Sequence, residues 1–295
     1  MASGTRRPVL AGFDGSEASR VGVRWAAQEA SSRRSPLLLV HVLAMPFQHS
    51  IPMRIPDEDQ VMDKLQRAVA RELDSLEETC RELDPTLEVE KRIPLGDAAQ
   101  ALGELAGDAE LVVLGGPLVG ARTDRLGATA AEVIGRRAAA PIVVVRGEAA
   151  AAADAPVVVG VDGSAVSERA VGFAYEFAAR HARPLVGVHA WSDTTFNPFE
   201  VFDEWETSQK EFRDKAHEVI AESMAGWGQR YPDVQVRYVA SADRPAQALL
   251  AEAEGANVLV VGSHGRGPVR RALLGSVSHA IVNQAGCPVA VLPAH

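Results

Sequence analysis

Short apolar runs alternate with longer stretches of mixed polarity along the second half of the chain. The apolar runs are rich in valine and leucine, as strands buried on both faces of a sheet are, and they cover residues 157–162, 184–190, 234–240, 257–261 and 288–292. Between them lie stretches with apolar positions near the helical period, at residues 164–180, 203–230, 245–254 and 275–285. This alternation predicts a doubly wound α/β domain, with a five-stranded parallel sheet and helices on both faces.

The first half of the chain repeats this pattern. The sequence around Asp14 returns around Asp162, at an offset of 162 − 14 = 148 residues. The apolar run that starts at Leu111 returns at Val258, at an offset of 258 − 111 = 147 residues. An offset held over most of the chain predicts two homologous domains, residues 1–147 and 155–295, joined by a short linker rich in alanine.

Length, composition and charge fit two globular domains and exclude some classes of partner. The chain has 295 residues, 47% of them hydrophobic, and a formal net charge of −9. This acidic balance argues against a nucleic-acid binder, although backbone amides can still bind a small anion. Two cysteines, one in each half, indicate neither a disulfide framework nor a metal site. We expect a cytoplasmic protein, because the sequence shows neither a secretory leader nor an apolar run of the ~20 residues that span a membrane.

Ligands bind open parallel sheets at the carboxyl ends of the strands, so the residues there are the first candidates. An Asp-Gly-Ser sequence follows the first strand of each half: Asp162, Gly163 and Ser164 in the second, and Asp14, Gly15 and Ser16 in the first. The aspartate can accept hydrogen bonds from a ribose hydroxyl or an adenine amino group. The alternative is structural, with the serine capping the next helix and the glycine permitting the turn. A phospho-acceptor role for the aspartate is disfavoured, because no acidic pair stands beside it to hold Mg²⁺.

A glycine-rich loop follows the fourth strand of the second half. It runs from Gly262 through Gly265 to Gly275 and Ser276, where a helix is predicted to begin. Glycines let the backbone approach a polyphosphate closely, and the free amides of a helix N-terminus bind anions. The loop has neither the lysine of a P-loop nor the third glycine of a dinucleotide fingerprint, so neither of those sites is indicated.

The spacing Gly262-x2-Gly265-x9-Gly275-Ser276 resembles the nucleotide motif of the ATP-binding universal stress proteins, and the likeness covers nearly the whole chain, twice. The resemblance implies two tandem Rossmann-like domains of the adenine nucleotide alpha hydrolase kind, in the tandem form common in actinobacteria. It implies that ATP, with or without Mg²⁺, binds the second domain mostly through the backbone. The residues implied to contact the nucleotide are Asp162, Gly163, Ser164, Ala190, Gly262, His264, Gly265, Arg266, Gly275, Ser276, Val277 and Ser278.

Several of the polar side chains near this motif have structural alternatives. For His264 we expect the peptide N–H to matter and not the ring. Arg266 fits a solvated surface at least as well as a phosphate contact. His41 and His189 end the second strand of each half, where we expect packed, hydrogen-bonded histidines and not catalytic bases.

The first half keeps the adenine end of the motif and changes the phosphate end. Asp14 recurs in it, and Val42 stands where the second half has alanine. Its loop is one residue shorter, with 127 − 115 = 12 residues from Gly115 to Gly127 against 275 − 262 = 13 in the second half. Thr129 offers the one hydroxyl where the second half has two serines. We therefore count Gly115, Gly127 and Thr129 as candidate contacts but expect weaker phosphate binding there.

The resemblance implies an ATP-binding regulatory or sensor protein of the stress response, and not an efficient enzyme. It also implies a homodimer whose chains pair their two domains internally. No general base, metal triad or activated nucleophile is evident in the sequence near the expected γ-phosphate. The alternatives are a slow ATPase and a dimerising stress protein that acts without nucleotide. An adenylate-forming transferase or ATP pyrophosphatase of related fold would need a longer phosphate loop after the first strand.

Overall fold

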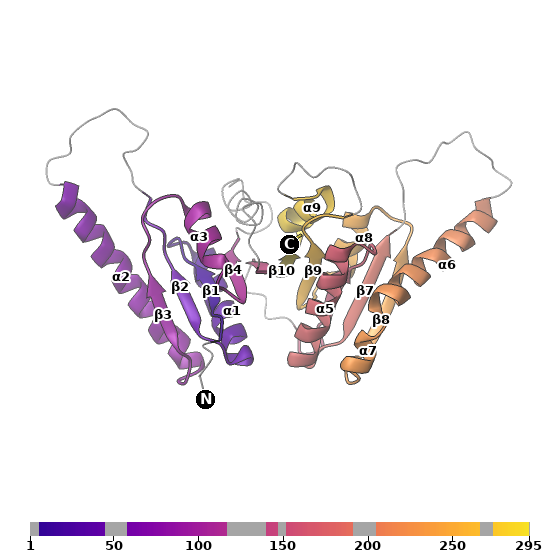
Figure 1. The fold of residues 1–295 in the computed structure, drawn as a ribbon, viewed down its shortest axis with the longest axis horizontal. Helices are drawn as coiled ribbons and strands as arrows, with labels where there is room; N and C mark the ends of the chain where they lie inside the picture. The colour runs from indigo at the N-terminus through magenta and orange to yellow at the C-terminus, as the bar shows by residue number, and fades with distance from the viewer. Residues whose placement is uncertain are drawn as a thin grey trace, which may run out of the picture. The chain divides into compact units, whose positions relative to one another are not determined.

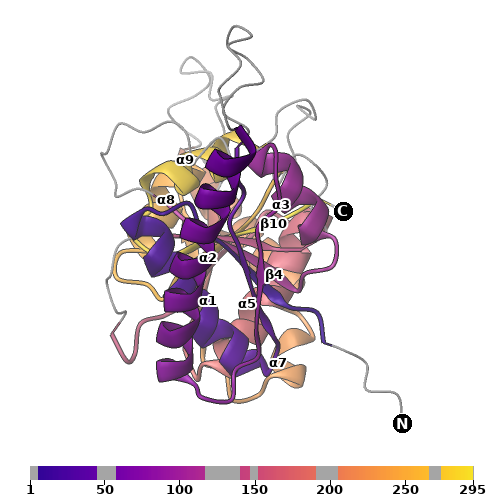
Figure 2. The same ribbon diagram turned by 90° about the vertical axis from the view of Figure 1, so that its left-hand side faces the viewer.

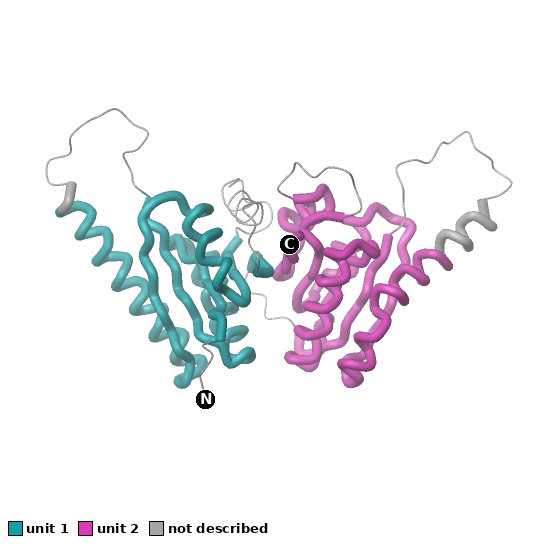
Figure 3. Tube along the Cα trace, viewed as in Figure 1, with its two compact units in different colours: residues 1–147 teal, residues 148–295 magenta. Residues whose placement is uncertain are grey.

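The computed structural model describes residues 6–44, 58–116, 140–146, 152–190, 205–265 and 274–294. The chain forms two compact units, Met1–Gly147 and Glu148–His295 (Figure 3). Each unit is an α/β domain built on a parallel sheet (Figure 1). Among the described helices, none is long and apolar enough to cross a membrane.

The sheet of unit 1 has the strand order β3-β2-β1-β4-β5. Its strands are β1 (Val9–Gly12), β2 (Leu37–Val40), β3 (Val89–Arg92), β4 (Leu111–Gly115) and β5 (Ile142–Val145). Neighbouring strands run parallel, and Val9 lies opposite both Leu37 and Leu111. Strands β1, β2, β4 and β5 are almost wholly buried, whereas β3 at the edge exposes charged side chains. The core of the unit therefore lies along the central strands.

The described helices of unit 1 are α1 (Glu17–Arg33), α2 (Glu58–Leu83) and α3 (Ala98–Ala106) (Figure 2). Helix α1 begins after Ser16, whose side-chain oxygen accepts a hydrogen bond from the Ser19 N–H. It ends at Arg34, which takes the left-handed conformation with φ 54°. Between these ends, α1 packs against β1 and β4. A Cβ atom on Gly22 would lie 2.9 Å from the backbone nitrogen of Gly115, so glycine permits the close approach of helix and strand.

Unit 2 repeats this order of strands, as β8-β7-β6-β9-β10. The strands are β6 (Val157–Gly160), β7 (Leu185–Ala190), β8 (Val236–Ser241), β9 (Val258–Gly262) and β10 (Val289–Leu292). The helices are α5 (Ala165–Arg180), α6 (Trp205–Met224), α7 (Trp227–Arg230), α8 (Pro245–Glu252) and α9 (Ser276–Gln284). Helix α5 contacts α6, and α8 contacts α9; right-handed crossovers put these pairs on opposite faces of the sheet. The predicted doubly wound fold is confirmed.

Two local predictions for unit 2 differ from the structure. The run at residues 234–240 was expected to be buried on both faces, but β8 is the edge strand and exposes Arg237 and Tyr238. The helix expected over residues 203–230 is broken, because Gly226 has a φ of 81° and separates α6 from α7. The ring of Trp227 then stacks on Tyr175 of α5, with centroids 6.1 Å apart, which holds α7 against the domain.

The turn after the first helix is left-handed in both units. Ala182 follows α5 with a φ of 50°, and it stands 182 − 34 = 148 residues after Arg34. Beside this turn, the guanidinium of Arg183 donates hydrogen bonds to the carbonyl oxygens of Ala152 and Ala153. The segment that leads into β6 is thereby fixed to unit 2.

Candidate functional site

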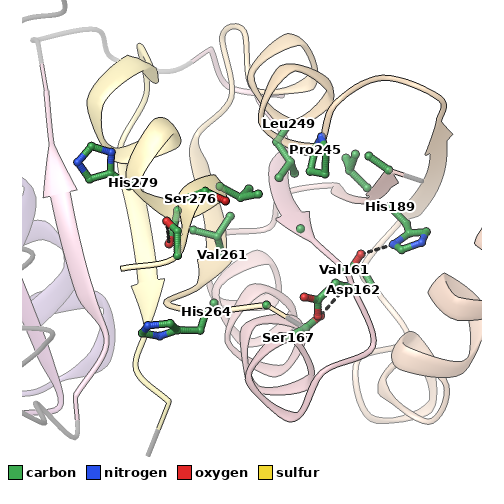
Figure 4. A pocket seen from close by; sticks show the side chains of 18 of the residues that line it. Val161, Asp162, Ser167, His189, Pro245, Leu249, Val261, His264, Ser276 and His279 are labelled. Carbon is green, nitrogen blue, oxygen red and sulfur yellow. Dashed lines mark hydrogen bonds between the residues drawn. The ribbon is translucent and has the colours of Figure 1, made fainter. Parts of the chain in front are cut away.

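A pocket with a volume of about 670 Å³ opens at the carboxyl edge of the unit 2 sheet (Figure 4). The ends of β6, β7 and β9 form it together with α8 and the start of α9. The candidate residues that line it are Asp162, Ala190, Gly262, His264, Gly265, Gly275, Ser276, Val277 and Ser278. Gly163 and Ser164 are not among its lining residues, and Arg266 lies outside the described part of the chain.

Asp162 is held in a fixed orientation at the end of β6. Its backbone N–H donates to the Ser167 hydroxyl at 3.0 Å, and its Oδ1 accepts from the Ser164 N–H at 2.9 Å. Ser164 in turn caps α5 by accepting from the Ser167 N–H, while Gly163 makes the turn with a φ of 72°. Gly163 and Ser164 thus have the structural roles that the sequence offered as alternatives. Asp162 presents its other carboxylate oxygen to the pocket, toward Gly265.

His189 lines the pocket as a packed, hydrogen-bonded histidine. Its Nδ1 lies 2.6 Å from the carbonyl oxygen of Val161, as the dashed line in Figure 4 shows. A carbonyl oxygen accepts only, so the proton of the neutral ring is on Nδ1 and the ring donates. This bond orients the ring at the end of β7 and leaves Nε2 as the remaining acceptor.

The carbonyl oxygen of Ser263 joins the two ends of the glycine-rich loop. It accepts the Gly275 N–H at 2.8 Å and the Ser278 hydroxyl at 2.9 Å. The N–H of Ser263 donates to Leu292 of β10 at 2.8 Å, so the junction is also anchored to the sheet. Ser278 is 2% exposed, and its single hydroxyl proton is directed to backbone carbonyls. The carbonyl oxygens of Ser263 and Gly275 would therefore compete with a phosphate oxygen for the Ser278 proton.

The N-terminus of α9 opens into the pocket without a capping side chain. Gly275 is the N-cap residue and makes no side-chain hydrogen bond, in contrast to Ser16 before α1 and Ser164 before α5. The first amides of a helix carry partial positive charge and seek an acceptor. Here those amides belong to pocket-lining residues, so an anion in the pocket would meet them. Ser276, the first residue of α9, is exposed.

The apolar wall of the pocket was not anticipated. It is formed by Val161, Val188, Pro245, Leu249, Val261 and Leu274. Leu249 of α8 reaches over the end of β6, where a Cβ on Gly160 would lie 3.2 Å from its side chain. Gly160, Ser167, His189 and His279 complete the lining. In the sequence these apolar residues look like ordinary core positions, and only the crossing of α8 over the strand ends reveals them.

The carboxyl edge of unit 1 differs in its hydrogen bonding. Oδ1 of Asp14 accepts from both the Ser16 N–H at 2.9 Å and the Ser16 hydroxyl at 2.5 Å, one donor more than Asp162 has from the matching serine. Burial acts to raise the pKa of Asp14, but these bonds and those involving Ser19 hold it below its ordinary value. The carboxylate of Asp14 therefore accepts more hydrogen bonds from its own loop than that of Asp162 does.

The remaining candidates of unit 1 are placed as follows. Gly15 makes the turn after β1 with a φ of 88°, and Val42 is half-buried just after β2. Gly115 ends β4 against the backbone of Ala18, where no Cβ would fit. Gly127 and Thr129 lie outside the described residues. Burial lowers the pKa of His41, and the backbone of Phe13 and the carboxylate of Asp14 act in the opposite direction.

We searched the described residues for side chains that could bind a metal ion. Within them, no group of three or more histidine, cysteine, aspartate or glutamate side chains is placed to hold a metal ion. The two thiols are buried, and burial raises the pKa of Cys80 and of Cys287 to about 11.

Comparison with known proteins agrees with this architecture. The model of the universal stress protein family matches residues 5–146 and 155–293. Universal stress protein Rv2005c of Mycobacterium tuberculosis is 36% identical over 288 residues, which cover 96% of each chain. A universal stress protein of Mycolicibacterium smegmatis is also 36% identical, with 98% of each chain covered. The structure of a universal stress protein from Archaeoglobus fulgidus has the same fold, with a TM-score of 0.68 at 18% identity over 98% of this chain and 99% of that one. The chain consists of two such domains in tandem and belongs to the universal stress protein family.

Proposed function

We propose that unit 2 binds ATP in its pocket and that the chain acts as a nucleotide-dependent regulator in the stress response. The observation that carries the proposal is that the carboxylate of Asp162 and the uncapped N-terminus of α9 face the same pocket. A pocket of about 670 Å³ lies within the usual range for small-molecule sites, about 300–1,000 Å³. An anionic ligand with a hydroxylated, partly apolar end fits this combination.

The base and ribose belong at the β6, β7 and α8 side of the pocket. Val161, Val188 and Leu249 give this side apolar surface of the kind that nucleobases pack against. The free oxygen of Asp162 would accept hydrogen bonds from ribose hydroxyls, because an ionised carboxylate only accepts. Ala190, at the end of β7, adds backbone atoms beside the base.

The phosphates belong at the start of α9. Its first amides would donate to phosphate oxygens, with the exposed hydroxyl of Ser276 beside them. Gly275 holds this end of the loop against Ser263 and leaves the approach free of a side chain. His264 lines the same pocket, and its peptide N–H is proposed as a further backbone donor at this end.

The fit of the loop to a ligand can be tested on Gly265. A Cβ there would lie 2.6 Å from Oδ2 of Asp162, so any larger residue displaces the carboxylate or the loop. No positive φ requires glycine at this position, which leaves close approach as the reason for it. A loop that keeps bare backbone beside the Asp162 carboxylate lets both groups line the same pocket, where a bound nucleotide would contact each of them.

Binding, and not turnover, is the proposed activity. Asp162 and His189, which keep Oδ2 and Nε2 as acceptors, follow β6 and end β7, at the side of the pocket proposed for the base and ribose. At the start of α9, where the phosphates are proposed to lie, the Ser278 proton is directed to backbone carbonyls. Slow hydrolysis by pocket water is the alternative, and a stress protein that acts through association without nucleotide is the second. The nucleotide site of unit 1 is proposed to be the weaker of the two.

The direct test is copurification followed by titration. Protein purified without added nucleotide is heated, and ATP released into the supernatant is measured by ion exchange. Calorimetry then compares the wild type with Gly265→Glu, which places a carboxylate in the loop, and with Gly286→Glu. Gly286 is exposed in the same unit, and a Cβ there meets nothing within 4 Å, so it controls for the added charge. We expect ATP affinity to be lost only in Gly265→Glu; equal loss in both variants, or in neither, refutes the site.

Association of two chains and pairing of the domains within a chain remain proposals drawn from the family. Light scattering of the full chain measures the first. The stress tolerance of cells that carry each variant is compared as well. If Gly265→Glu abolishes ATP binding but changes neither the oligomeric state nor this tolerance, the nucleotide-independent alternative is favoured.

A further inference from the structure

A buried arginine stands at the end of β5 in unit 1. Arg146 is 7% exposed, and its Nε and Nη1 are buried without a hydrogen-bond partner in the described part of the chain. Burial lowers the pKa of this guanidinium, yet arginine stays charged at neutral pH. Burying a charged group whose N–H donors have no acceptors costs free energy, and a hydrogen-bond acceptor would stabilise it.

The neighbouring end of β4 makes room for this side chain. Gly116 follows β4, and its N–H donates to the Val145 carbonyl at 2.7 Å. A Cβ on Gly116 would lie 3.0 Å from Nε of Arg146 and 2.8 Å from a methyl group of Val144. The absence of a side chain at this glycine therefore keeps space for the guanidinium at the carboxyl edge of the sheet.

Unit 2 has no equivalent of this arrangement. At the offset of 147 residues, Gly116 corresponds to Ser263 (263 − 116 = 147) and Arg146 to Pro293 (293 − 146 = 147). Ser263 is buried and joins the loop ends, and the position after β10 carries no charge. In unit 2 the guanidinium of Arg169 lies at this place instead and donates to the Pro293 carbonyl oxygen, so its charge has an acceptor that Nε and Nη1 of Arg146 lack among the described residues.

We propose that Arg146, beside Gly116, binds an oxyanion at the carboxyl edge of the unit 1 sheet. The ligand class is a phosphate or carboxylate group, because a guanidinium with unmet N–H donors pairs best with such oxygens. Inorganic phosphate and the phosphate of a nucleotide share this chemistry. The site does not depend on the nucleotide pocket proposed in unit 2.

Thermal unfolding of the full chain tests the assignment. The variants are Arg146→Met, which keeps the length of the stem, and Arg71→Met, which removes an exposed arginine of α2 as the control. Each is measured in potassium phosphate and in potassium chloride of equal ionic strength. We expect phosphate to raise the unfolding midpoint of the wild type and of Arg71→Met, and Arg146→Met to weaken the apparent phosphate affinity about tenfold or more.

The same experiment separates a ligand site from a structural arginine. In chloride, Arg146→Met should be at least as stable as the wild type, because an uncompensated buried charge has been removed. A lower midpoint for Arg146→Met in chloride, or an unchanged phosphate response, overturns the proposal. Any phosphate response of unit 2 is common to both proteins and cancels in their comparison.

ATP calorimetry in a Gly265→Glu background, with and without Arg146→Met, identifies the source of the anion. An isotherm that Arg146→Met abolishes assigns the oxyanion to a nucleotide in unit 1. Phosphate stabilisation without an ATP isotherm assigns it to the free anion. If the unit 2 proposal fails, the wild type and Gly265→Glu bind ATP equally well. That result differs from both outcomes described for Arg146.

Discussion

Oδ2 of Asp162 and the Cα of Gly265 lie so close that a Cβ atom on the glycine would be 2.6 Å from the carboxylate oxygen. The two residues come from different strand ends, β6 and β9, and both line the pocket. Because of this contact, Gly265→Ala is expected to move the Asp162 carboxylate.

Gly265→Ala should weaken ATP binding by about tenfold or more, or about 1.4 kcal/mol, because the methyl group forces Asp162 out of place. In an Asp162→Ala background the same change should cost almost nothing, since the clash is gone. Calorimetry on this double-mutant cycle measures the coupling. Gly286→Ala serves as the control, and additive effects of the two changes would show that the contact does not shape the site.

The serines of α9 should separate binding from stability. Ser278→Ala removes a buried hydrogen bond to the Ser263 carbonyl and should lower the free energy of unfolding by about 1 kcal/mol. Ser276→Ala, at an exposed position, should change stability by less than about 0.5 kcal/mol while weakening ATP more than adenosine. Denaturant unfolding and calorimetry provide the two readouts. A Ser278→Ala protein of unchanged stability would mean that its hydroxyl serves the ligand instead.

The two units should differ in their affinity for ATP. Unit 1 has no serine at the position of Ser276, and one lost hydrogen bond to a phosphate oxygen, at about 1.5–3 kcal/mol, weakens binding by about tenfold or more. Titration of the full chain should therefore resolve one tight site, which Gly265→Glu removes, and leave at most a much weaker one. Two sites of equal affinity would show that unit 1 holds phosphate as well as unit 2 does, with Arg146 as the first residue to examine.

Turnover of Mg-ATP by the pure protein should fall well below ordinary enzyme rates of about 1–10³ s⁻¹. The reason is that Asp162 and His189 stand at the proposed base and ribose side of the pocket, whereas the Ser278 hydroxyl at the start of α9 donates to backbone carbonyls. Phosphate release is measured with Gly265→Glu protein as the background control. A rate in the enzymatic range that this substitution abolishes would make the chain an ATPase.

Both thiols should be unreactive in the folded protein. Cys80 and Cys287 are 0% and 5% exposed, and burial raises the pKa of each to about 11, so little thiolate is present near pH 8. An aromatic disulfide reagent should label neither cysteine until denaturant is added, and should then label both. Rapid labelling of one thiol in native buffer would show that its unit opens locally.

Much of the architecture follows from the sequence because its signals are local or repeated. The Asp-Gly-Ser turns, the spacing from Gly262 to Gly275 and the constant offset are visible without any knowledge of packing. The family match and the structural neighbours confirm the two-domain α/β fold that these signals predict.

The parts that could not be predicted depend on distant contacts. Leu249 enters the pocket because α8 crosses the strand ends, and its apolar character is equally typical of a core residue. The Ser278 hydroxyl turns inward because the Ser263 carbonyl, 15 residues away, lies within reach. The break at Gly226 between α6 and α7 is different, because its signal is local: Gly226 and Gly228 both stand within the stretch expected to be one helix.

The left-handed turn after the first helix shows what tandem duplication has preserved. Arg34 in one copy and Ala182 in the other share a positive φ, although neither is glycine and such a backbone costs about 1–2 kcal/mol per residue. The side chains at this position have diverged completely in charge and size, while the direction of the chain has not. The two domains therefore agree more closely in the path of the backbone at this turn than in the residues that follow it, and both accept the same unfavourable torsion.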